Sequence, residues 1–176
     1  MYGVSAGNDG RQRNAQQCAR AKASNTAPAR IIRAARRWLG TPYHDQASVR
    51  GVGCDCLGLI RGVWREVVGD EPQNKTGPVP PYSRDWGETG PVEVLAGAAR
   101  AAMIEIDVAK ARTGDVVLFR MRAGAIAKHC GILSPQTRFI HAYERSGVIE
   151  QELTPAWQRR ITDVPSEPRR HPDVAT

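Results

Sequence analysis

Three cysteines lie in the body of the chain, and cysteine is the residue type best suited to covalent chemistry. Cys54 and Cys56 stand two positions apart, too close for an unstrained disulfide, and Cys130 lies far downstream. The fourth cysteine, Cys18, falls in a polar stretch without periodicity. We therefore exclude a disulfide scaffold. Three roles remain for the group of Cys54, Cys56 and Cys130: a nucleophile, a metal site, or buried apolar packing.

Cys56 has the sequence setting of a nucleophile. It follows Asp55, a predicted N-cap, and precedes an amphipathic helix that Gly69 ends. Backbone N–H groups and the positive end of the helix dipole stabilise a thiolate at such a position. The apolar stripe that defines this helix consists of Leu59, Ile60, Val63, Trp64, Val67 and Val68.

A thiolate nucleophile needs a base, and the base needs a third group to orient its ring. His171 lies near the C-terminus and His44 in the loop before the nucleophile, whereas His129 opens one predicted strand and His141 lies within the next. In a tight hairpin of strands 129–134 and 138–144, the latter two are diagonal neighbours near one sheet face. The sequence thus supplies a nucleophile, a base and an orienting group.

The remaining elements must position these residues. A helix is predicted from the N-cap Thr26 to Gly40, with Ile31, Ile32, Ala35, Trp38 and Leu39 as its apolar stripe, and an Ala-rich helix is predicted within 91–103. A short helix begins at Thr154 and Pro155 and runs through Trp157. Between these helices the period becomes that of strands, which predicts an antiparallel meander of 115–121, 129–134, 138–144 and 147–153. Helices followed by a meander indicate an α+β domain.

The domain boundaries follow from composition. Residues 1–25 are polar and lack periodicity, so we expect a flexible basic arm that serves as a docking segment. The domain itself spans 26–165, and residues 166–176 form a tail that we expect to fray. Within the domain, residues 70–92 hold five prolines and are predicted to form a long surface loop.

The charge distribution argues against nucleic-acid binding. The chain of 176 residues has a net charge of +7, and residues 1–40, with eight Lys or Arg and one acid, carry all of this excess. A nucleic-acid-binding domain has a basic face with interleaved aromatic residues, which this region lacks. No apolar run approaches the length of a membrane span, and the first thirty residues have no secretory signal. We therefore expect synthesis in the cytoplasm without a signal peptide.

The segment GTPYHDQASVRGVGCDCLGLIRGVWRE, residues 40–66, resembles the N-terminal motif of the NlpC-type cell-wall peptidases. GDVVLF (114–119), KHCGIL (128–133) and FIHAYE (139–144) resemble the strand motifs of that family in the same order. The match is most similar to the branch found in phage tails and gene transfer agents. The resemblance implies a papain-like domain, with the nucleophile at a helix N-terminus and the helices packed on a small meander.

The resemblance also implies roles for individual residues. The nucleophile of the family corresponds to Cys56, the base to His129 and the third polar position to His141. Tyr43 corresponds to a tyrosine whose hydroxyl lies near the oxyanion or the substrate. Asp55 either caps the helix or holds a free amino group of the stem peptide. Cys130 stands beside the base where relatives usually have Val or Ala, and we interpret it as a small buried strand residue.

The function implied is hydrolysis of stem-peptide amide bonds in peptidoglycan by a cysteine peptidase, at the bond between D-glutamate and the diamino acid. We expect no metal, no other cofactor and no nucleic-acid partner. The branch implies docking to tail-hub or tail-tip proteins through the arm, and action on the cell wall in the periplasm from a phage-like particle.

Two other interpretations remain open. The first is a catalytically silent tail component with the same fold. The second is a zinc-binding structural protein that uses Cys54, Cys56, His129, Cys130 and His141. Against zinc, the C-x-C pair is shorter than the usual C-x2-C spacing, and consecutive strand residues His129 and Cys130 point to opposite faces.

Overall fold

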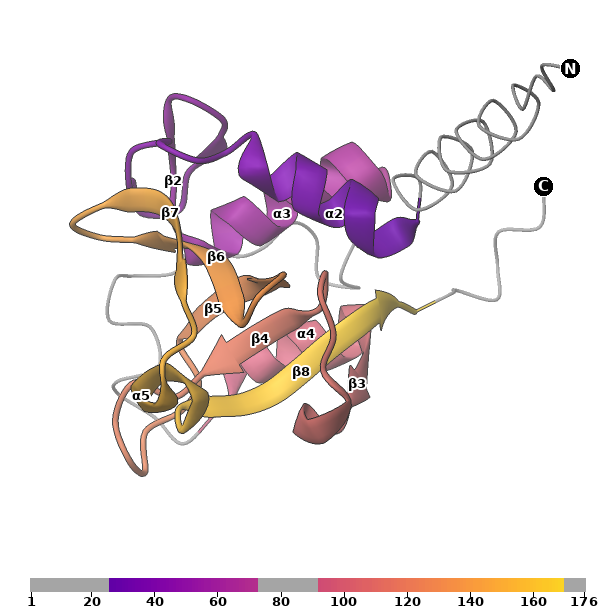
Figure 1. Cartoon of the computed structure of the whole chain (residues 1–176), viewed down its shortest axis with the longest axis vertical. Coiled ribbons are helices and arrows are strands. Elements are labelled where there is room, and N and C mark those ends of the chain that lie inside the picture. The colour runs from indigo at the N-terminus through magenta and orange to yellow at the C-terminus, as the bar shows by residue number, and fades with distance from the viewer. Residues whose placement is uncertain (1–25, 73–91, 170–176) are drawn as a thin grey trace, which may run out of the picture.

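The computed structural model describes residues 26–72 and 92–169 of the chain. These residues form the predicted α+β fold, with the three longer helices on one face of an antiparallel sheet and a short helix on the other (Figure 1). The predicted arm 1–25, most of the predicted loop 70–92 and the end of the tail lie outside the described residues. Within the described part of the chain, no helix combines the length and apolar character needed to cross a membrane.

A six-stranded antiparallel sheet with the order β3-β8-β4-β5-β6-β7 forms the centre of the domain (Figure 1). Four of its strands form the meander that the sequence predicts, and their pairing confirms that prediction. These strands are β4 (Val116–Phe119), β5 (His129–Ser134), β6 (Arg138–Tyr143) and β7 (Gly147–Glu152). In the β5–β6 turn, Gln136 and Thr137 take left-handed φ angles of 62° and 56°.

The sequence analysis misses two strands, β3 (Met103–Ile106) and β8 (Ile161–Pro168). β8 pairs with both β3 and β4, and it includes residues 166–168 of the tail that we expected to fray. Its prolines, Pro165 and Pro168, argue against a strand when sequence alone is considered. Pairing with two neighbours therefore outweighs the local sequence signal in this segment.

The predicted helices are present with small differences in length. α3 (Cys56–Val67) and α4 (Val94–Ala102) confirm the predictions for those segments, and α5 (Pro155–Gln158) is the predicted short helix. α2 (Ala27–Arg36) is shorter than expected, because a turn leads from Arg36 to Gly40, whose φ is +80°. Leu39 lies in this turn and is 42% exposed, so its assignment to the apolar stripe was wrong.

Two short elements complete the described part of the fold. β1 (Ser48–Val49) and β2 (Gly53–Cys54) form a two-stranded hairpin within a segment that we expected to be a loop. Strands of two residues are too short to show the period of a strand in the sequence. A turn of 3-10 helix, η1 (Val108–Lys110), follows β3.

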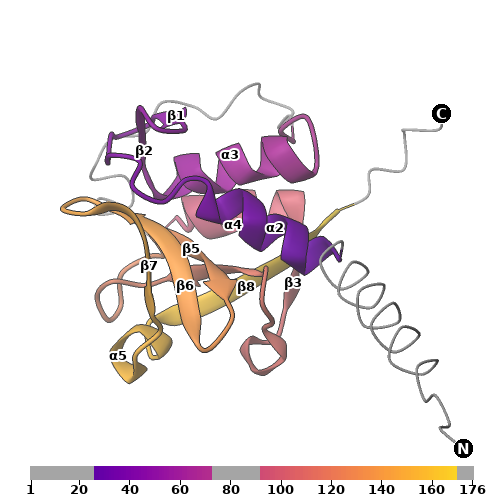
Figure 2. The same ribbon diagram turned by 45° about the horizontal axis from the view of Figure 1, so that its top comes forward.

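The sheet separates two hydrophobic cores. One lies between the sheet and α2, α3 and α4, and it contains Cys54, Cys56 and Cys130 (Figure 2). The other lies on the opposite face and contains Phe119, Phe139 and Val164, with Trp157 of α5 packed against it. Consecutive residues of β5 therefore enter different cores, and this alternation determines which side chains can approach the start of α3.

Candidate active site

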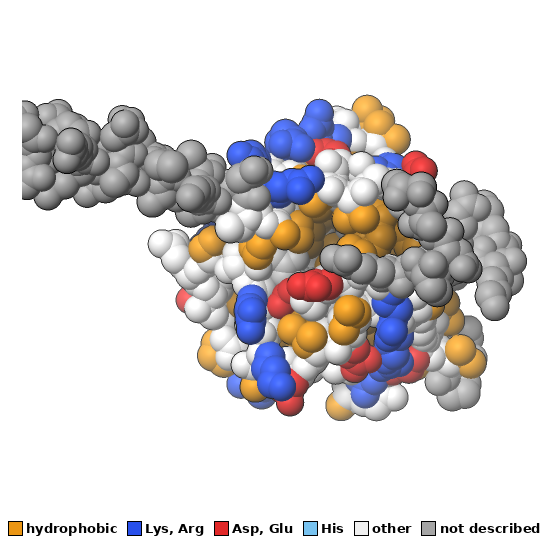
Figure 3. Space-filling model, turned by 90° about the vertical axis from the view of Figure 1, so that its right-hand side faces the viewer, with side chains coloured by type: hydrophobic (Ala, Val, Ile, Leu, Met, Phe, Trp, Pro, Cys, Tyr) orange, Lys and Arg blue, Asp and Glu red, His pale blue; other side chains and the backbone are white. Residues whose placement is uncertain are grey.

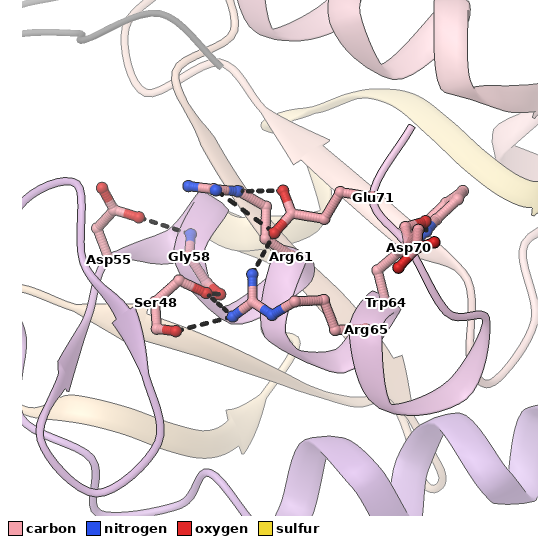
Figure 4. A network of polar contacts seen from close by, with 8 residues as sticks. All are labelled: Ser48, Asp55, Gly58, Arg61, Trp64, Arg65, Asp70 and Glu71. Carbon is pink, nitrogen blue, oxygen red and sulfur yellow. Dashed lines mark hydrogen bonds and ion pairs between the residues drawn. The ribbon is translucent and has the colours of Figure 1, made fainter. Parts of the chain in front are cut away.

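The start of α3 holds Cys56 in a fixed position. The Asp55 carboxylate accepts a hydrogen bond from the Gly58 backbone N–H at 2.6 Å, which is a standard N-cap (Figure 4). Cys56 is the first residue of the helix and is 8% exposed. The same turn is tied to the β1–β2 hairpin, because the Ser48 hydroxyl donates to the Gly58 carbonyl at 2.6 Å. Cys56 thus lies at the positive end of the helix dipole, as predicted.

The second Asp55 oxygen stabilises the loop that precedes the nucleophile. It accepts a hydrogen bond from the Gln46 backbone N–H at 2.8 Å, and the whole residue is 3% exposed. Gly58 permits this close packing, since a Cβ atom there would lie 1.9 Å from the Ala47 carbonyl oxygen. Of the two roles considered for Asp55, the structure shows the helix cap.

His129 and His141 lie next to each other, as the diagonal pairing predicts. β5 and β6 pair in the register Ile132–Ile140, which places His141 opposite Gly131, two residues from His129. The His129 Nε2 and the His141 Nδ1 are 2.7 Å apart. Gly131 makes room for the pair, because a Cβ atom at this position would lie 3.2 Å from the His141 Cβ and 3.0 Å from the Ile140 carbonyl oxygen.

His129 connects the pair to the nucleophile. After hydrogen bonding of Cys130, the hydrogen bonding and charge of His129 are the main causes that lower the pKa of Cys56, so the His129 ring lies beside the thiol. Because Nε2 is engaged by His141, the nitrogen left for Cys56 is Nδ1. The structure therefore arranges the three residues in the order Cys56, His129, His141, which is the order that a nucleophile, base and orienting group require.

The surroundings lower the pKa of both Cys56 and His141, for different reasons. A hydrogen bond from the Cys130 thiol, together with the hydrogen bond and charge of His129, lowers the pKa of Cys56 well below its usual value in spite of burial. Burial, with a contribution from the charge of His129, lowers the pKa of His141 to about 3. His141 is therefore neutral at physiological pH and can accept a hydrogen bond at Nδ1 from His129.

Tyr43 lies beside the nucleophile on the segment before the hairpin. It is half-buried and forms an isolated bridge with Cys54. Burial and the negative charges of Cys56 and Asp45 raise its pKa, and its hydroxyl hydrogen-bonds the Asp45 side chain. Tyr43 is thus near the reacting group, but a role as oxyanion donor would require its hydroxyl to turn from Asp45.

Aromatic side chains surround the histidine pair on the face opposite α3. The Phe139 ring stacks on His141 with a centroid distance of 4.4 Å, and the Trp157 ring lies 5.7 Å from His129. Phe119 also packs against His129, at 5.7 Å. The sequence analysis did not assign these residues to the site, because the hydrophobic pattern shows that they are buried without showing which rings they contact.

Cys130 is a further residue near the site that sequence reasoning missed. It is 1% exposed, as expected of a small strand residue, and hydrogen bonding with Cys56 and burial raise the pKa of its thiol. Strand alternation predicts that it points away from His129, yet only the packing of α3 on β5 shows that this direction leads to the nucleophile. Cys54, by contrast, is fully buried, and burial raises its pKa to about 12.

Metal binding finds no support in the geometry of the described residues. Within 26–72 and 92–169, no three His, Cys, Asp or Glu side chains are grouped so that they could hold an ion. Cys54, Cys56 and Cys130 are free thiols.

A hydrophobic pocket lies behind Cys130. It has a volume of about 110 Å³, and its lining includes Leu57, Trp64, Leu95, Met103 and Cys130. The side of the molecule seen in Figure 3 shows hydrophobic side chains gathered between charged ones. Arg61 of α3 and Glu71 also line the pocket, and Glu71 pairs with both Arg61 and Arg65 of this helix (Figure 4).

A family model and individual known proteins match the same part of this chain. The model of the NlpC/P60 family matches residues 40–165, more than half of the chain. Murein DD-endopeptidase MepS/Murein LD-carboxypeptidase of Escherichia coli strain K12 is 31% identical over 127 residues, which are 72% of this chain and 55% of that protein. The same protein of E. coli O157:H7 matches equally well. The chain spans about half the length of the curated relatives that it matches.

Solved structures show the same fold. The NlpC/P60 domain of the peptidoglycan hydrolase SagA superposes with a TM-score of 0.55 and 23% identity, covering 79% of this chain and 97% of that one. An NlpC/P60 family protein from Bacillus cereus has a TM-score of 0.59 and 19% identity, covering 81% of this chain and 40% of that one.

Proposed function

The chain belongs to the NlpC/P60 family of cell-wall cysteine peptidases, and on that premise we propose that it hydrolyses amide bonds in the stem peptides of peptidoglycan. One observation carries the proposal. The His129 Nε2 lies 2.7 Å from the His141 Nδ1, and His129 lies beside Cys56 at the start of a helix, where the pKa of Cys56 is well below its usual value. The likeness to a murein endopeptidase over 72% of the chain supports peptidoglycan as the substrate.

The reaction begins with the Cys56 thiolate. Its sulfur attacks the carbonyl carbon, a C–S bond forms, and the carbonyl oxygen becomes an oxyanion. The Cys56 backbone N–H stabilises that oxyanion, with the Tyr43 hydroxyl as a second donor when it turns from Asp45. His129 gives the proton on Nδ1 to the amide nitrogen, the C–N bond breaks, and the amine leaves.

Water completes the cycle. His129 Nδ1 takes a proton from a water molecule, whose oxygen attacks the thioester carbon and releases the acid and the Cys56 thiolate. His141 keeps the ring of His129 oriented throughout, since its Nδ1 accepts the hydrogen bond from Nε2 at 2.7 Å. Because the pKa of His141 is about 3, this acceptor stays unprotonated over the pH range of the reaction.

Within the stem peptide, we propose cleavage between D-glutamate and the diamino acid. The resemblance of segment 40–66 to the NlpC-type motif supports this bond. The E. coli relative is named for D,D-endopeptidase and L,D-carboxypeptidase activities, and these define the alternative products.

Digestion of purified peptidoglycan tests both the activity and the bond. The native protein, Cys56→Ala and the control Cys54→Ala, which removes a buried thiol outside the proposed machinery, are compared by mass analysis of the released fragments. We expect new stem-peptide fragments from the native protein and from Cys54→Ala, and none from Cys56→Ala. Fragments cut at the D,D or L,D bond would overturn the proposed bond, and no cleavage by well-folded native protein would favour a silent component.

For the place of action, we propose a phage-like tail from which the domain reaches the cell wall. The likeness of segment 40–66 to the phage-tail and gene-transfer-agent branch supports this. The arm of residues 1–25, with four Lys or Arg and one acid, is the proposed docking segment for a tail-hub or tail-tip protein. Deletion of residues 1–25 should abolish incorporation into particles and leave wall cleavage intact, whereas unchanged incorporation would contradict this assignment.

A further inference from the structure

The Nε2 atom of His141 is a buried polar group that the reaction above does not use. His141 is fully buried, and its Nδ1 lies 2.7 Å from the His129 Nε2. Because Nδ1 accepts that hydrogen bond, the proton of the neutral ring is on Nε2. Among the residues that the structure describes, this Nε2 has no hydrogen-bond partner. A buried N–H without an acceptor is costly, and it binds water wherever water can reach it.

Aromatic rings surround His141 on the face of the sheet opposite α3. β6 places Phe139, His141 and Tyr143 on one face, since side chains alternate along a strand. Trp157 of α5 packs on this row, with ring centroids 5.1 Å from Phe139, 5.4 Å from His141 and 6.5 Å from Tyr143. The same ring lies 5.7 Å from His129. Trp157 thus contacts both histidines and both neighbours of His141 in the row.

The angles between these rings show which of them can meet the Nε2–H of His141. An N–H bond lies in the plane of its own ring, so it points at the face of another ring only where the two planes are steep to each other. Phe139 stacks on His141 at 29°, and Tyr143 is tilted by 47°. Trp157 is at 74° to His141, in an edge arrangement. Of these three rings, Trp157 is therefore the one placed to cover the N–H.

We propose that Trp157 is a positioning residue, which acts through His141 by covering its Nε2–H and excluding water from that position. The proposal rests on the function proposed above, because it concerns the group that orients the base. Protonation of His141 at Nδ1 removes the acceptor for His129, and water at Nε2 favours that protonation by solvating the charged ring. By excluding water, Trp157 keeps His141 neutral and its Nδ1 free to accept from His129.

The groups that face His141 show how much its neutral state depends on burial. His129 faces it from β5, and Tyr143 follows it on β6 at a centroid distance of 5.7 Å. Its partner on β7, Ile149, is not titratable, and the Arg160 guanidinium lies 5.5 Å from the centre of the covering indole. Burial is the main cause that lowers the pKa of His141, and the charge of His129 lowers it further. Loss of the cover therefore removes part of the larger effect.

Nuclear magnetic resonance of the histidine side chains tests this proposal without substrate. The imidazole nitrogen shifts report the charge and tautomer of each ring, and His141→Gln identifies the His141 signals by their loss. Between about pH 7 and pH 4.5, native protein should keep His141 neutral with its proton on Nε2. Trp157→Ala opens the ring to water, so we expect the titration midpoint of His141 to rise by about two units, a hundredfold gain of the charged form above both midpoints. Trp157→Phe keeps an aromatic cover and should behave like the native protein.

A matched control separates the cover on His141 from a general loss of packing. Trp64→Ala removes an indole of α3 that packs against the other core, and it should leave His141 neutral over the same range. Neutral His141 in Trp157→Ala, charging in Trp157→Phe, or equal charging in Trp64→Ala would overturn the proposal. If Trp157→Ala does not fold, Trp157→Leu, which lacks the ring, takes its place with the same expectation. The measurement needs no peptidase activity, so its failure is distinguished from failure of the proposed function by the digestion experiment.

Discussion

The protonation states of the active-site residues depend on their burial as well as on the side chains beside them. His141 is fully buried, Cys130 is 1% exposed, and Cys56 is 8% exposed. In such surroundings a hydrogen bond to a charge is strong, and an unpaired charge is costly. His141 therefore stays neutral, and hydrogen bonding of Cys130 and His129, with the charge of His129, lowers the pKa of Cys56 in spite of its burial.

The low pKa of His141 predicts a loss of stability in acid. Between pH 6.5 and its folded pKa of about 3, the unfolded chain binds a proton at His141 that the folded chain does not. The free energy of unfolding therefore falls with decreasing pH, at up to about 1.4 kcal/mol per unit from this residue. His141→Gln keeps an acceptor for His129 and should remove this slope. Urea unfolding at several pH values measures both slopes, and equal slopes would contradict the prediction.

The start of α3 is the element that organises the site. Asp55 binds the helix through Gly58 and the preceding loop through Gln46, so one side chain positions both the nucleophile and the segment that carries Tyr43. The β1–β2 hairpin lies over the same turn and contacts it through Ser48. Changes at this cap should therefore alter both stability and catalysis.

Substitution of Asp55 separates its two suggested roles. Asp55→Ala removes an N-cap and should lower the free energy of unfolding by about 1–2 kcal/mol. Asp55→Asn keeps an acceptor for the Gly58 N–H, so we expect a smaller loss and an unchanged KM for stem peptides. Urea unfolding and steady-state kinetics measure these effects. A large rise in KM for Asp55→Asn with retained stability would show that the carboxylate binds the substrate amine.

A second prediction at this scale concerns two helical glycines. In most helices Gly→Ala stabilises, and Gly97→Ala in α4 should do so by about 0.5–1 kcal/mol, because nothing lies within 4 Å of the added carbon. Gly58→Ala should instead destabilise by about 1–3 kcal/mol, since the added carbon would lie 1.9 Å from the Ala47 carbonyl oxygen. Thermal unfolding compares the two variants, and stabilisation by Gly58→Ala would refute the close packing.

At the scale of the whole molecule, β8 joins the two parts of the sheet. It lies between β3 and β4, and its Val164 is fully buried in the second core. The Arg100 side chain of α4 also pairs with Asp163 of this strand. Two of the positive charges at the end of α2 form ion pairs within the fold. Arg36 pairs with Glu150, and Arg37 pairs with Glu66.

Truncation tests the importance of β8. Deletion of residues 161–176 removes the partner of both β3 and β4 and exposes the second core, so we expect a chain that does not fold cooperatively. Deletion of residues 170–176 leaves β8 complete and should preserve the transition. Circular dichroism during heating distinguishes the two, and a cooperative transition in the shorter chain would show that β8 is dispensable.

The sequence by itself determined the elements with a strong local pattern. The stripe of α3, its cap at Asp55 and the alternation of β4 to β7 predicted these elements, and hairpin pairing alone predicted that His129 and His141 are neighbours. Only the tertiary structure decided the rest. β3, β8 and the β1–β2 hairpin form through pairing between segments whose own patterns are short or interrupted by proline. Cys130 and Cys56 share one core because α3 packs on β5, whereas strand alternation by itself specifies a direction but not the group that lies there.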